Sequence, residues 1–392
     1  MAIEGDLTVR LDWDGRRVRK ATVRSTRPFA ASRVLVGRTS ADAVRIAPRL
    51  FSLCARAQGA AASGAIEAAT GRTPTRKMLA AREAAVLLEA IQEYLWRILL
   101  DWPQAMGHDA QTEPVAAARQ LIAPVLARVA AIACQAEGDA HDASAAMPDA
   151  VASGLVELTT RHVFGIPAAA WLALGDGKAL AAWTARAPTL PARLCGELSA
   201  KAPALGRSDV ASMPAPRRDA LLAAVVPAMR STPGFERAPL WQGAPMETGA
   251  LARTHAHPLV AAALAQYGNA VPTRMVARLA ELALLVGRLG GAPAEDTVSP
   301  WVDSFPLAAG EGLAAVQTAR GLLLHRACVA DGNVTLYQIV APTEWNFHPA
   351  GALVRGLEGA AAPDAAALAS DARLVVQALD PCVDCRVEVA RA

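Results

Sequence analysis

The sequence predicts an α+β fold in which helices dominate and the sheets are small and antiparallel. Two hairpin patterns, one near each end of the chain, predict the sheets, and the apolar residues between them recur mainly at helical spacing. The chain has 392 residues and is 53% hydrophobic, which is enough to bury a large core. We expect one domain over residues 1–392, with an N-terminal hairpin (7–25), a helical body (50–290) and a C-terminal part (320–392).

The two hairpins are predicted from alternation and from their turn residues. In Leu7–Ser25, apolar residues alternate with polar ones around Asp14-Gly15. Gly321–Val340 has the same features around Asp331-Gly332. Aspartate followed by glycine is typical of tight hairpin turns, so both segments predict paired antiparallel strands.

Helices are predicted in the body of the chain. Thr75–Leu100 has the clearest helical period, and Thr273–Leu289 has another that Gly290-Gly291 would end. The alanine-rich stretches near 111–153 and 360–370 predict helix plus loop. Pro188–Pro245 is dense in proline and is expected to be irregular.

Charge and composition exclude several classes of function. The net charge is +3, from 39 basic and 36 acidic residues without a basic block, and aromatic residues make up only 4%. We therefore expect no nucleic-acid partner. Met1–Asp6 lacks the start of a signal peptide, and no apolar run is long enough to span a bilayer. Six scattered cysteines do not form a disulfide framework, so we expect a cytoplasmic protein without membrane insertion.

The sharpest local motif is Cys382-Val383-Asp384-Cys385, because two cysteines three positions apart can direct both sulfurs at one metal. Half of a zinc site and a redox pair are the alternatives, but no second Cys-x-x-Cys exists to complete a zinc site. Cys54 taken alone is by default a buried apolar residue. The sequence predicts no role for three other cysteines, Cys134, Cys195 and Cys328, and by default four histidines are structural: His255, His257, His325 and His348.

Seven blocks, in order, resemble the large subunit of nickel–iron hydrogenases over nearly the whole chain. In the N-terminal half, residues 3–5 match the family pattern Arg-Ile-Glu-Gly-His, residues 49–58 match Arg-x-Cys-Gly-x-Cys-x-x-x-His, and residues 100–102 match the end of the first long helix. Further along, residues 246–253 match Met-Glu-Val-Gly-Pro-Leu-Ala-Arg, and residues 317–325 match Glu-Ala-Pro-Arg-Gly with a downstream His. Residues 337–346 match Tyr-Gln with Pro-Thr-Thr-Trp-Asn, and residues 380–385 match Asp-Pro-Cys-x-x-Cys. This resemblance implies the large-subunit fold.

The departures from that pattern carry as much information as the matches. Phe51 stands where the first cysteine of the N-terminal pair would be, Gln58 and Glu388 replace the two motif histidines, and Gln317 replaces a glutamate. The sequence ends four residues after Glu388, so we also expect no extension for a maturation protease to remove.

The resemblance implies which metal ligands remain. In the family the second cysteine of each pair bridges nickel and iron, and the first binds nickel alone. Here both bridging positions, Cys54 and Cys385, are retained, together with one nickel-only position, Cys382. We therefore expect Cys54 and Cys385 to lie close together, buried beside Arg320. An iron site without a complete nickel site is the pattern of the HupK/HoxV-type accessory proteins.

The resemblance also implies the surroundings of the metal. Arg320 and Thr343 align with residues that face the cyanide ligands of the iron. Asp101 and Glu4, which fall in the matching segments 100–102 and 3–5, are further candidates for the surroundings of the metal. Iron(II) with two cyanides and two thiolates is formally a dianion, so a buried cation and hydrogen-bond donors are needed around it. We expect Arg320 and Thr343 to supply them, with Asp101 as the candidate ion-pair partner if Arg320 is structural instead.

These expectations define the predicted function. The chain is a maturation scaffold, not an enzyme, that transiently carries iron with cyanide and carbonyl ligands and no nickel. Its expected partners are the hydrogenase large-subunit precursor and iron-group assembly proteins of the Hyp type. The alternatives are a divergent hydrogenase with residual catalysis, a quinone-site subunit of the complex I type, and a metal-free mimic of the large subunit. The last two have no need of three cysteines at ligand positions.

Overall fold

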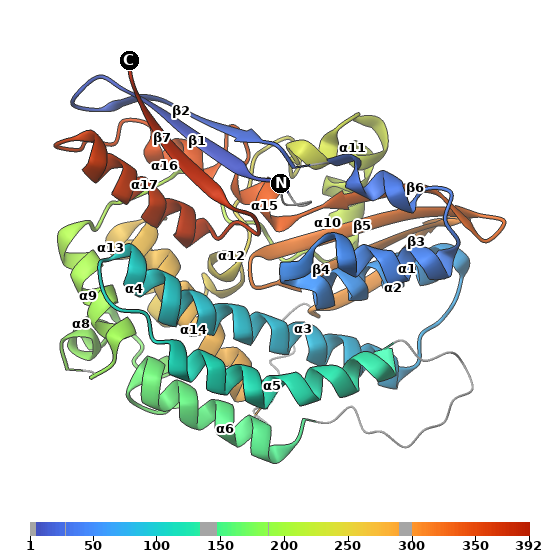
Figure 1. The fold of residues 1–392 in the computed structure, drawn as a ribbon, viewed down its shortest axis with the longest axis horizontal. Coiled ribbons are helices and arrows are strands. Elements are labelled where there is room, and N and C mark those ends of the chain that lie inside the picture. The colour runs from blue at the N-terminus through green and yellow to red at the C-terminus, as the bar shows by residue number, and fades with distance from the viewer. Residues whose placement is uncertain (1–4, 28, 134–146, 187, 290–299) are drawn as a thin grey trace.

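A computed structural model describes residues 5–27, 29–133, 147–186, 188–289 and 300–392. Figure 1 shows a small sheet built from the two ends of the chain, a second sheet that carries helices from the N-terminal part, and a layer of long helices below both. The prediction of a mainly helical α+β fold is confirmed.

The smaller sheet joins the two ends of the chain. Strands β1 (Leu7–Trp13) and β2 (Val18–Ser25) form the predicted antiparallel hairpin. Strand β7 (Cys385–Arg391) lies on the other side of β1 and runs parallel to it. The expectation of purely antiparallel sheets is wrong here. Strands joined by a long connection are not bound by a hairpin turn and can pair in parallel.

The larger sheet is an antiparallel meander of four strands. These are β3 (Val302–Ala308), β4 (Glu311–Thr318), β5 (Gly321–Ala330) and β6 (Asn333–Val340). The hairpin of β5 and β6 confirms the second predicted hairpin, and both turn residues, Asp331 and Gly332, have positive φ. The sequence did not predict strand β4. All eight of its residues are buried, and a strand that is buried on both faces need not alternate between apolar and polar residues.

Helix α2 (Ala55–Thr70) lies against the larger sheet. The approach is close: a Cβ at Gly312 of β4 would lie 2.3 Å from the carbonyl oxygen of Ala65, and one at Gly64 would lie 2.9 Å from Cβ of Ser304. Glycine and alanine at this interface therefore permit the packing. The N-terminus of α2, where Cys54 lies, is thereby fixed relative to the sheet.

Two long helices, α3 (Arg76–Trp96) and α14 (Val271–Leu289), match the two that the sequence predicts. The hydroxyl of Thr75 accepts a hydrogen bond from the N–H of Met78 and caps α3. Helix α3 ends at Trp96 and not at the predicted Leu100. A π-helical turn, η3 (Arg97–Asp101), follows it and leads into the short helix α4 (Trp102–Ala105). Pro103, which has no N–H to donate, follows that turn.

The other described helices complete the body of the protein. In chain order they are η1 (Phe29–Leu35), α1 (Ser40–Leu50), η2 (Ser52–Cys54), α5 (Thr112–Ala133), α6 (Asp149–Thr159), η4 (Thr160–Phe164), α7 (Ala168–Leu172), α8 (Gly177–Arg186), α9 (Leu190–Lys201), α10 (Arg218–Ala224), α11 (Val226–Ser231), η5 (Phe235–Arg237), α12 (Ala250–Thr254), α13 (Pro258–Tyr267), α15 (Pro342–Asn346), α16 (Ala352–Leu357) and α17 (Ala365–Leu379). Helices α5, α6 and α17 confirm the helical part of the prediction for the alanine-rich stretches, and residues 134–146 lie outside the described residues.

The segment Pro188–Pro245 is more regular than its proline content suggested. It contains α9, α10 and α11, and prolines stand in the first turn of α9 (Pro191) and of α11 (Pro227). A proline in the first turn does not break a helix, because the N–H groups there have no intrahelical acceptor. Proline density therefore misled the prediction at these positions.

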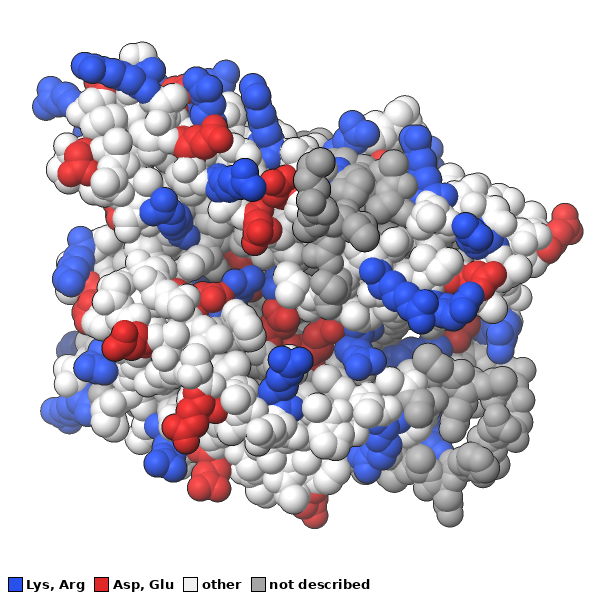
Figure 2. All heavy atoms as spheres, in the orientation of Figure 1, with Lys and Arg blue, Asp and Glu red and all other residues white. Residues whose placement is uncertain are grey.

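The surface agrees with the balanced charge of the sequence. On the face that Figure 2 shows, Lys and Arg side chains are interspersed with Asp and Glu, and no large patch of one sign covers the described atoms. None of the helices in the described ranges is both long enough and apolar enough to cross a bilayer.

Candidate functional site

Cys54 lies at the junction of η2 and α2. Its side chain does not cap the helix. Glu89 of α3 does so instead, because its carboxylate accepts hydrogen bonds from the N–H groups of Arg56 (2.8 Å) and Ala57 (3.0 Å). Burial raises the pKa of Glu89 to about 7, although these hydrogen bonds oppose the rise. The cap fixes Cys54 between the helix start and α3.

Cys382 follows α17 and is held by Thr343 of α15. The Thr343 hydroxyl donates to Cys382 Sγ (3.1 Å) and lies 3.2 Å from the backbone N–H of Cys382, which donates to it. Between the helix and the cysteine, Asp380 adopts a left-handed conformation (φ 56°). This turn directs the segment back toward the N-terminal part of the molecule.

The structure brings Cys54 and Cys382 together. Each is 7% exposed, and each lies within electrostatic reach of the other. Burial raises the pKa of Cys54 far above its usual range, and the neighbouring Cys382 and Glu89 raise it further. Arg320 and the amide of Gln58, which donates to Cys54 Sγ (3.6 Å), act in the opposite direction. A thiolate at Cys54 therefore needs a nearby cation or metal to stabilise it.

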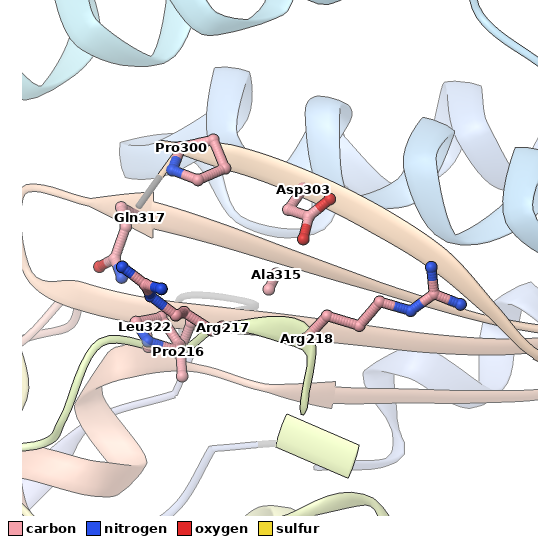
Figure 3. Close-up of a pocket in the computed structure, with 8 residues that line it drawn as sticks. All are labelled: Pro216, Arg217, Arg218, Pro300, Asp303, Ala315, Gln317 and Leu322. Atoms are coloured by element: carbon pink, nitrogen blue, oxygen red, sulfur yellow. The ribbon is translucent and has the colours of Figure 1, made fainter. Parts of the chain in front are cut away.

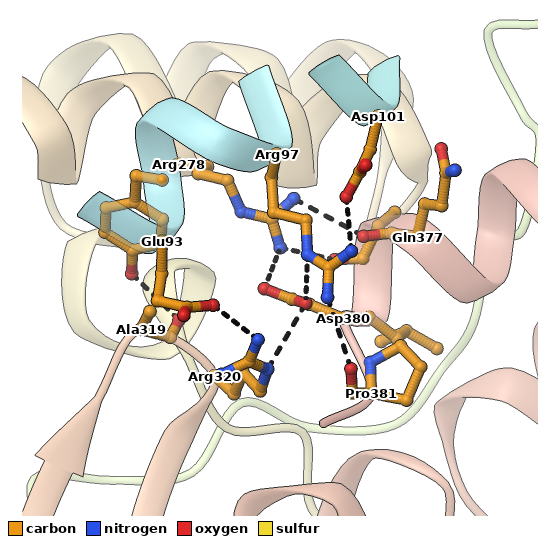
Figure 4. A network of polar contacts seen from close by, with 12 residues as sticks. Glu93, Arg97, Asp101, Arg278, Ala319, Arg320, Gln377, Asp380 and Pro381 are labelled. Carbon is orange, nitrogen blue, oxygen red and sulfur yellow. Dashed lines mark hydrogen bonds and ion pairs between the residues drawn. The ribbon is translucent and has the colours of Figure 1, made fainter. Parts of the chain in front are cut away.

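Arg320 lies at the turn between β4 and β5 and is 3% exposed. Its Nη2 lies 2.5 Å from Glu93 Oε2, and its Nε lies 3.4 Å from Asp380 Oδ1. The same Asp380 carboxylate lies 2.8 Å from Arg97 Nε and 3.6 Å from Arg278 Nη2. Figure 4 shows the three guanidinium groups converging on Asp380. Arg320 is thus held rigidly beside the two cysteines.

The Asp380 cluster corrects one expectation. Asp101 pairs with Arg97, one helical turn earlier on η3, and not with Arg320. Burial raises the pKa of Asp380, but Arg97, Arg320 and Arg278 lower it more, so the net pKa is below the ordinary value. Arg97 also donates to the carbonyl oxygen of Pro381 (3.4 Å), next to Cys382. Asp101 therefore supports the site indirectly, through Arg97.

A second buried arginine, Arg27, lies beside the same two sulfurs. Its Nη1 is 2.7 Å from Glu344 Oε1, and its guanidinium carbon lies 5.7 Å from the centroid of the Phe51 ring. Burial lowers the pKa of Arg27, but the electrostatic effects of Cys382, Glu344 and Cys54 outweigh it, so the net pKa is raised. The sequence did not predict Arg27, since it belongs to no motif. One feature of the sequence could have indicated a buried cation here: position 344 is glutamate, where the hydrogenase pattern has threonine.

A buried chain of polar groups supports Cys54 from the other side. Gln58 Oε1 lies 2.9 Å from His325 Nε2, and His325 Nδ1 lies 2.8 Å from the Tyr337 hydroxyl. Burial lowers the pKa of His325 to about 3, so the ring is neutral. A neutral ring that donates from Nε2 to Gln58 accepts from Tyr337 at Nδ1. His325 therefore holds the amide that bonds to Cys54.

The third cysteine at a predicted ligand position, Cys385, lies in the smaller sheet. It is the first residue of β7, opposite Leu7 in the parallel pair, and is half-buried against the core. Burial alone raises its pKa to about 12. Within the described ranges, no three His, Cys, Asp or Glu side chains converge as a metal-ligand set. The structure thus brings Cys54 near Cys382, and the closeness of Cys54 and Cys385 stays a prediction.

The remaining predicted residues lie elsewhere. Glu4 and Cys134 lie outside the described residues. Cys195 is in the core, and Cys328 is half-buried on β5. Three histidines bond to the backbone, in line with the structural role that is their default: His255 to the oxygen of Ala252, His257 to the N–H of Leu259, and His348 to the N–H of Ala350.

A separate pocket of about 130 Å³ lies on the other face of the larger sheet (Figure 3). Ala315 and Leu322 line it, and both pack in the smaller hydrophobic cluster away from α2. Arg217, Arg218 and Gln317 also line it. Gln317 Oε1 accepts a hydrogen bond from Arg253 (2.7 Å), so the residue that replaces the family's glutamate stabilises a structural network. This pocket is not part of the cysteine site.

The arrangement at Cys54 and Cys382 can hold an anionic metal group. Two thiols offer soft sulfur ligands, Arg27 and Arg320 supply fixed positive charge, and the Thr343 hydroxyl can donate a hydrogen bond.

Comparison with known sequences identifies close relatives. Residues 291–388 match the family described as nickel-dependent hydrogenase. The hydrogenase expression/formation protein HoxV of Cupriavidus necator is 33% identical over 374 residues, which cover 93% of this chain and 91% of that protein. The hydrogenase expression/formation protein HupK of Azotobacter vinelandii is 32% identical over 380 residues, 96% of each.

Comparison with solved structures confirms the predicted hydrogenase-like fold. The nickel–iron–selenium hydrogenase of Desulfomicrobium baculatum, in a reduced and active form, matches with a TM-score of 0.59 over 95% of both chains at 16% identity. The as-isolated oxidized enzyme of D. vulgaris Hildenborough matches with a TM-score of 0.57 over 94% of both chains at 18% identity. At such identities the likeness establishes the fold alone.

Proposed function

This chain belongs to the family of hydrogenase expression/formation proteins that includes HupK and HoxV, and from that premise we propose that it is a non-catalytic maturation scaffold. Its cargo is the iron group of a nickel–iron hydrogenase, with cyanide and carbonyl ligands. It assembles or holds this group and passes it to the large-subunit precursor. Iron-group assembly proteins of the Hyp type act before it.

The observation that carries this proposal is the buried pair of Cys54 and Cys382 within electrostatic reach of two buried arginines. Both sulfurs interact with Arg27 and with Arg320. A buried cysteine pair with no ligand would have no need of two arginines, since neutral thiols are stable without a cation. Paired guanidinium groups match a site that must accept negative charge.

The formal charge of the iron group fits the charges of the residues around the cysteine pair. Iron(II) with two cyanides and two thiolates has a formal charge of −2, and carbonyl adds none. Arg320 is already paired with Glu93 and Asp380, so its charge is partly offset. Arg27 is likewise paired with Glu344, whose pKa burial raises to about 7. The site therefore attracts the group without neutralising it completely, which suits a protein that must release it.

The experiment is infrared spectroscopy on protein purified without oxygen from cells that make the Hyp-type proteins. We expect cyanide and carbonyl bands together with about one iron per chain, since one sulfur pair can hold one group. Cys54→Ala should remove the bands. Cys195→Ala is the matched control, because Cys195 is also buried but lies in the core of α9. Bands that survive Cys54→Ala, or disappear in Cys195→Ala, would refute the proposed site.

A further inference from the structure

We propose that Arg27 occupies the role of a second metal cation at the cysteine pair, so that the site accepts one anionic iron group and rejects a further divalent cation such as Ni²⁺. This inference rests on the proposed function. It concerns selectivity, and Arg27 is a specificity-determining residue here and not a metal ligand.

The first support is the position of Arg27. Arg27 lies two residues after the end of β2 and is 7% exposed. Glu344 of α15 anchors its Nη1 at 2.7 Å, and the ring of Phe51 lies 5.7 Å from the guanidinium carbon. Arg27 is therefore held in place from two sides.

The second support is electrostatic. The charge of Arg27 interacts with Cys54 and with Cys382 together. A guanidinium stays protonated in proteins, so this positive charge is permanent. A divalent cation that approached the same sulfurs would be repelled at short range in a buried environment, where screening is weak. Iron(II) that brings two cyanides is formally neutral and meets no such repulsion, and once it binds both thiolates the complex is a dianion that Arg27 stabilises.

The third support is that two departures from the hydrogenase pattern meet at this arginine. Phe51 stands where the pattern has a cysteine, and Glu344 stands where it has a threonine. The ring removes a thiolate and offers its face to a cation, while the carboxylate fixes that cation. Loss of a nickel ligand and gain of a fixed cation are thus found at one place.

The alternative is that Arg27 and Glu344 form an ordinary structural ion pair with no effect on metal selectivity. Removal of both charges separates the two cases, because replacing a buried pair by uncharged side chains of similar volume is often tolerated. The test variant is therefore Arg27→Met/Glu344→Gln. Arg27→Lys is the charge-keeping variant. Arg274→Met/Glu247→Gln removes another buried pair, which lies 2.8 Å apart, and serves as the matched control.

The measurement is Ni²⁺ binding to iron-free protein under anaerobic conditions, with Co²⁺ as a second probe because its thiolate charge-transfer bands report sulfur ligation. We expect Arg27→Met/Glu344→Gln to bind Ni²⁺ and Co²⁺ at least tenfold more tightly than the unmodified protein. Arg27→Lys and the control pair should bind them no better than the unmodified protein. Equal affinity in the test variant and the unmodified protein would overturn the inference, and so would stoichiometric nickel in the unmodified protein.

A second variant keeps the test decisive if the double variant does not fold. Phe51→Cys adds a thiolate while Arg27 stays, and we expect it to gain no stoichiometric nickel. If Phe51→Cys alone binds one Ni²⁺ per chain, the missing sulfur and not Arg27 sets the selectivity. These titrations use iron-free protein, so their outcome is separate from the infrared test, which alone decides whether the iron group is bound.

Discussion

Thr343 and Cys382 exchange two hydrogen bonds: the threonine hydroxyl donates to the cysteine sulfur at 3.1 Å and accepts from the cysteine N–H at 3.2 Å. Both residues are buried, so neither bond can be replaced by solvent. The pair joins α15 to the segment after α17 and fixes where the sulfur lies.

Replacement of this threonine tests the contact. Thr343→Val keeps the shape but removes the hydroxyl, and it leaves the buried N–H of Cys382 without that acceptor. We expect the free energy of unfolding to fall by about 1–3 kcal/mol. Urea denaturation measures it, and Thr343→Ser, which keeps the hydroxyl, should lose less. Equal losses in the two variants would show that the methyl group, not the hydroxyl, matters.

Arg320 has a larger structural role than the sequence suggested. If Arg320 served only the cyanide ligands, as the resemblance implies, Arg320→Leu would weaken retention of the iron group and leave the fold intact. Because Arg320 pairs with Glu93 and Asp380, we now expect this change to destabilise the protein by about 3–5 kcal/mol as well. Arg320→Lys should lose less. An Arg320→Leu protein as stable as the unmodified one in urea would contradict the role of this ion-pair cluster.

His325 predicts a pH dependence of stability. Burial lowers its pKa to about 3 from an ordinary value of 6.5, so between these values the unfolded chain binds more protons than the folded one. The stability from this residue is therefore present above pH 6.5 and is lost as the pH falls toward 3, by up to about 1.4 kcal/mol per pH unit. His325→Gln should flatten this slope in urea denaturation from pH 7 to pH 4. His255→Gln, the control at a histidine bonded to a backbone oxygen, should keep it.

The choice between Cys382 and Cys385 as the partner of Cys54 gives a further prediction. With the bridging role that the resemblance implies for Cys385, Cys385→Ala would abolish the cyanide and carbonyl bands and Cys382→Ala would keep them. The structure places Cys382 with Cys54, and Cys385 in the sheet beside Leu7. We therefore expect the reverse order: Cys382→Ala loses the bands and Cys385→Ala retains them. Infrared spectra of the two variants decide between the two pairings.

The sequence predicted those parts of the fold that depend on local pattern. The hairpin at Leu7–Ser25 and the helix that begins after Thr75 follow from alternation, turn residues and a cap. Strand β7 also alternates, but no turn residue indicates its partner, because its pairing with β1 depends on a contact between the chain ends. Proline in first turns concealed α9 and α11 for a similar reason, since composition alone does not give position within a helix.

The site was predicted in part. The resemblance singled out Arg320 and Thr343 as neighbours of the iron ligands, and in the structure Arg320 lies within electrostatic reach of Cys54 and Cys382 while Thr343 donates to Cys382 Sγ. It did not indicate Arg27, whose role depends on packing against Phe51 and a pair with a glutamate more than 300 positions away. Long-range ion pairs of this kind leave no periodic signal in one sequence, and only the folded structure shows them.

The central claim is that this protein carries the iron group without nickel and without catalysis. The most direct measurement combines infrared spectroscopy, metal analysis and a hydrogen uptake assay on one sample, purified without oxygen from cells that make the Hyp-type proteins. We predict cyanide and carbonyl bands, about one iron per chain, no stoichiometric nickel and no hydrogen turnover, because one sulfur pair and two arginines hold one anionic group. One nickel per chain with hydrogen turnover, or iron-free protein without these bands, would contradict it.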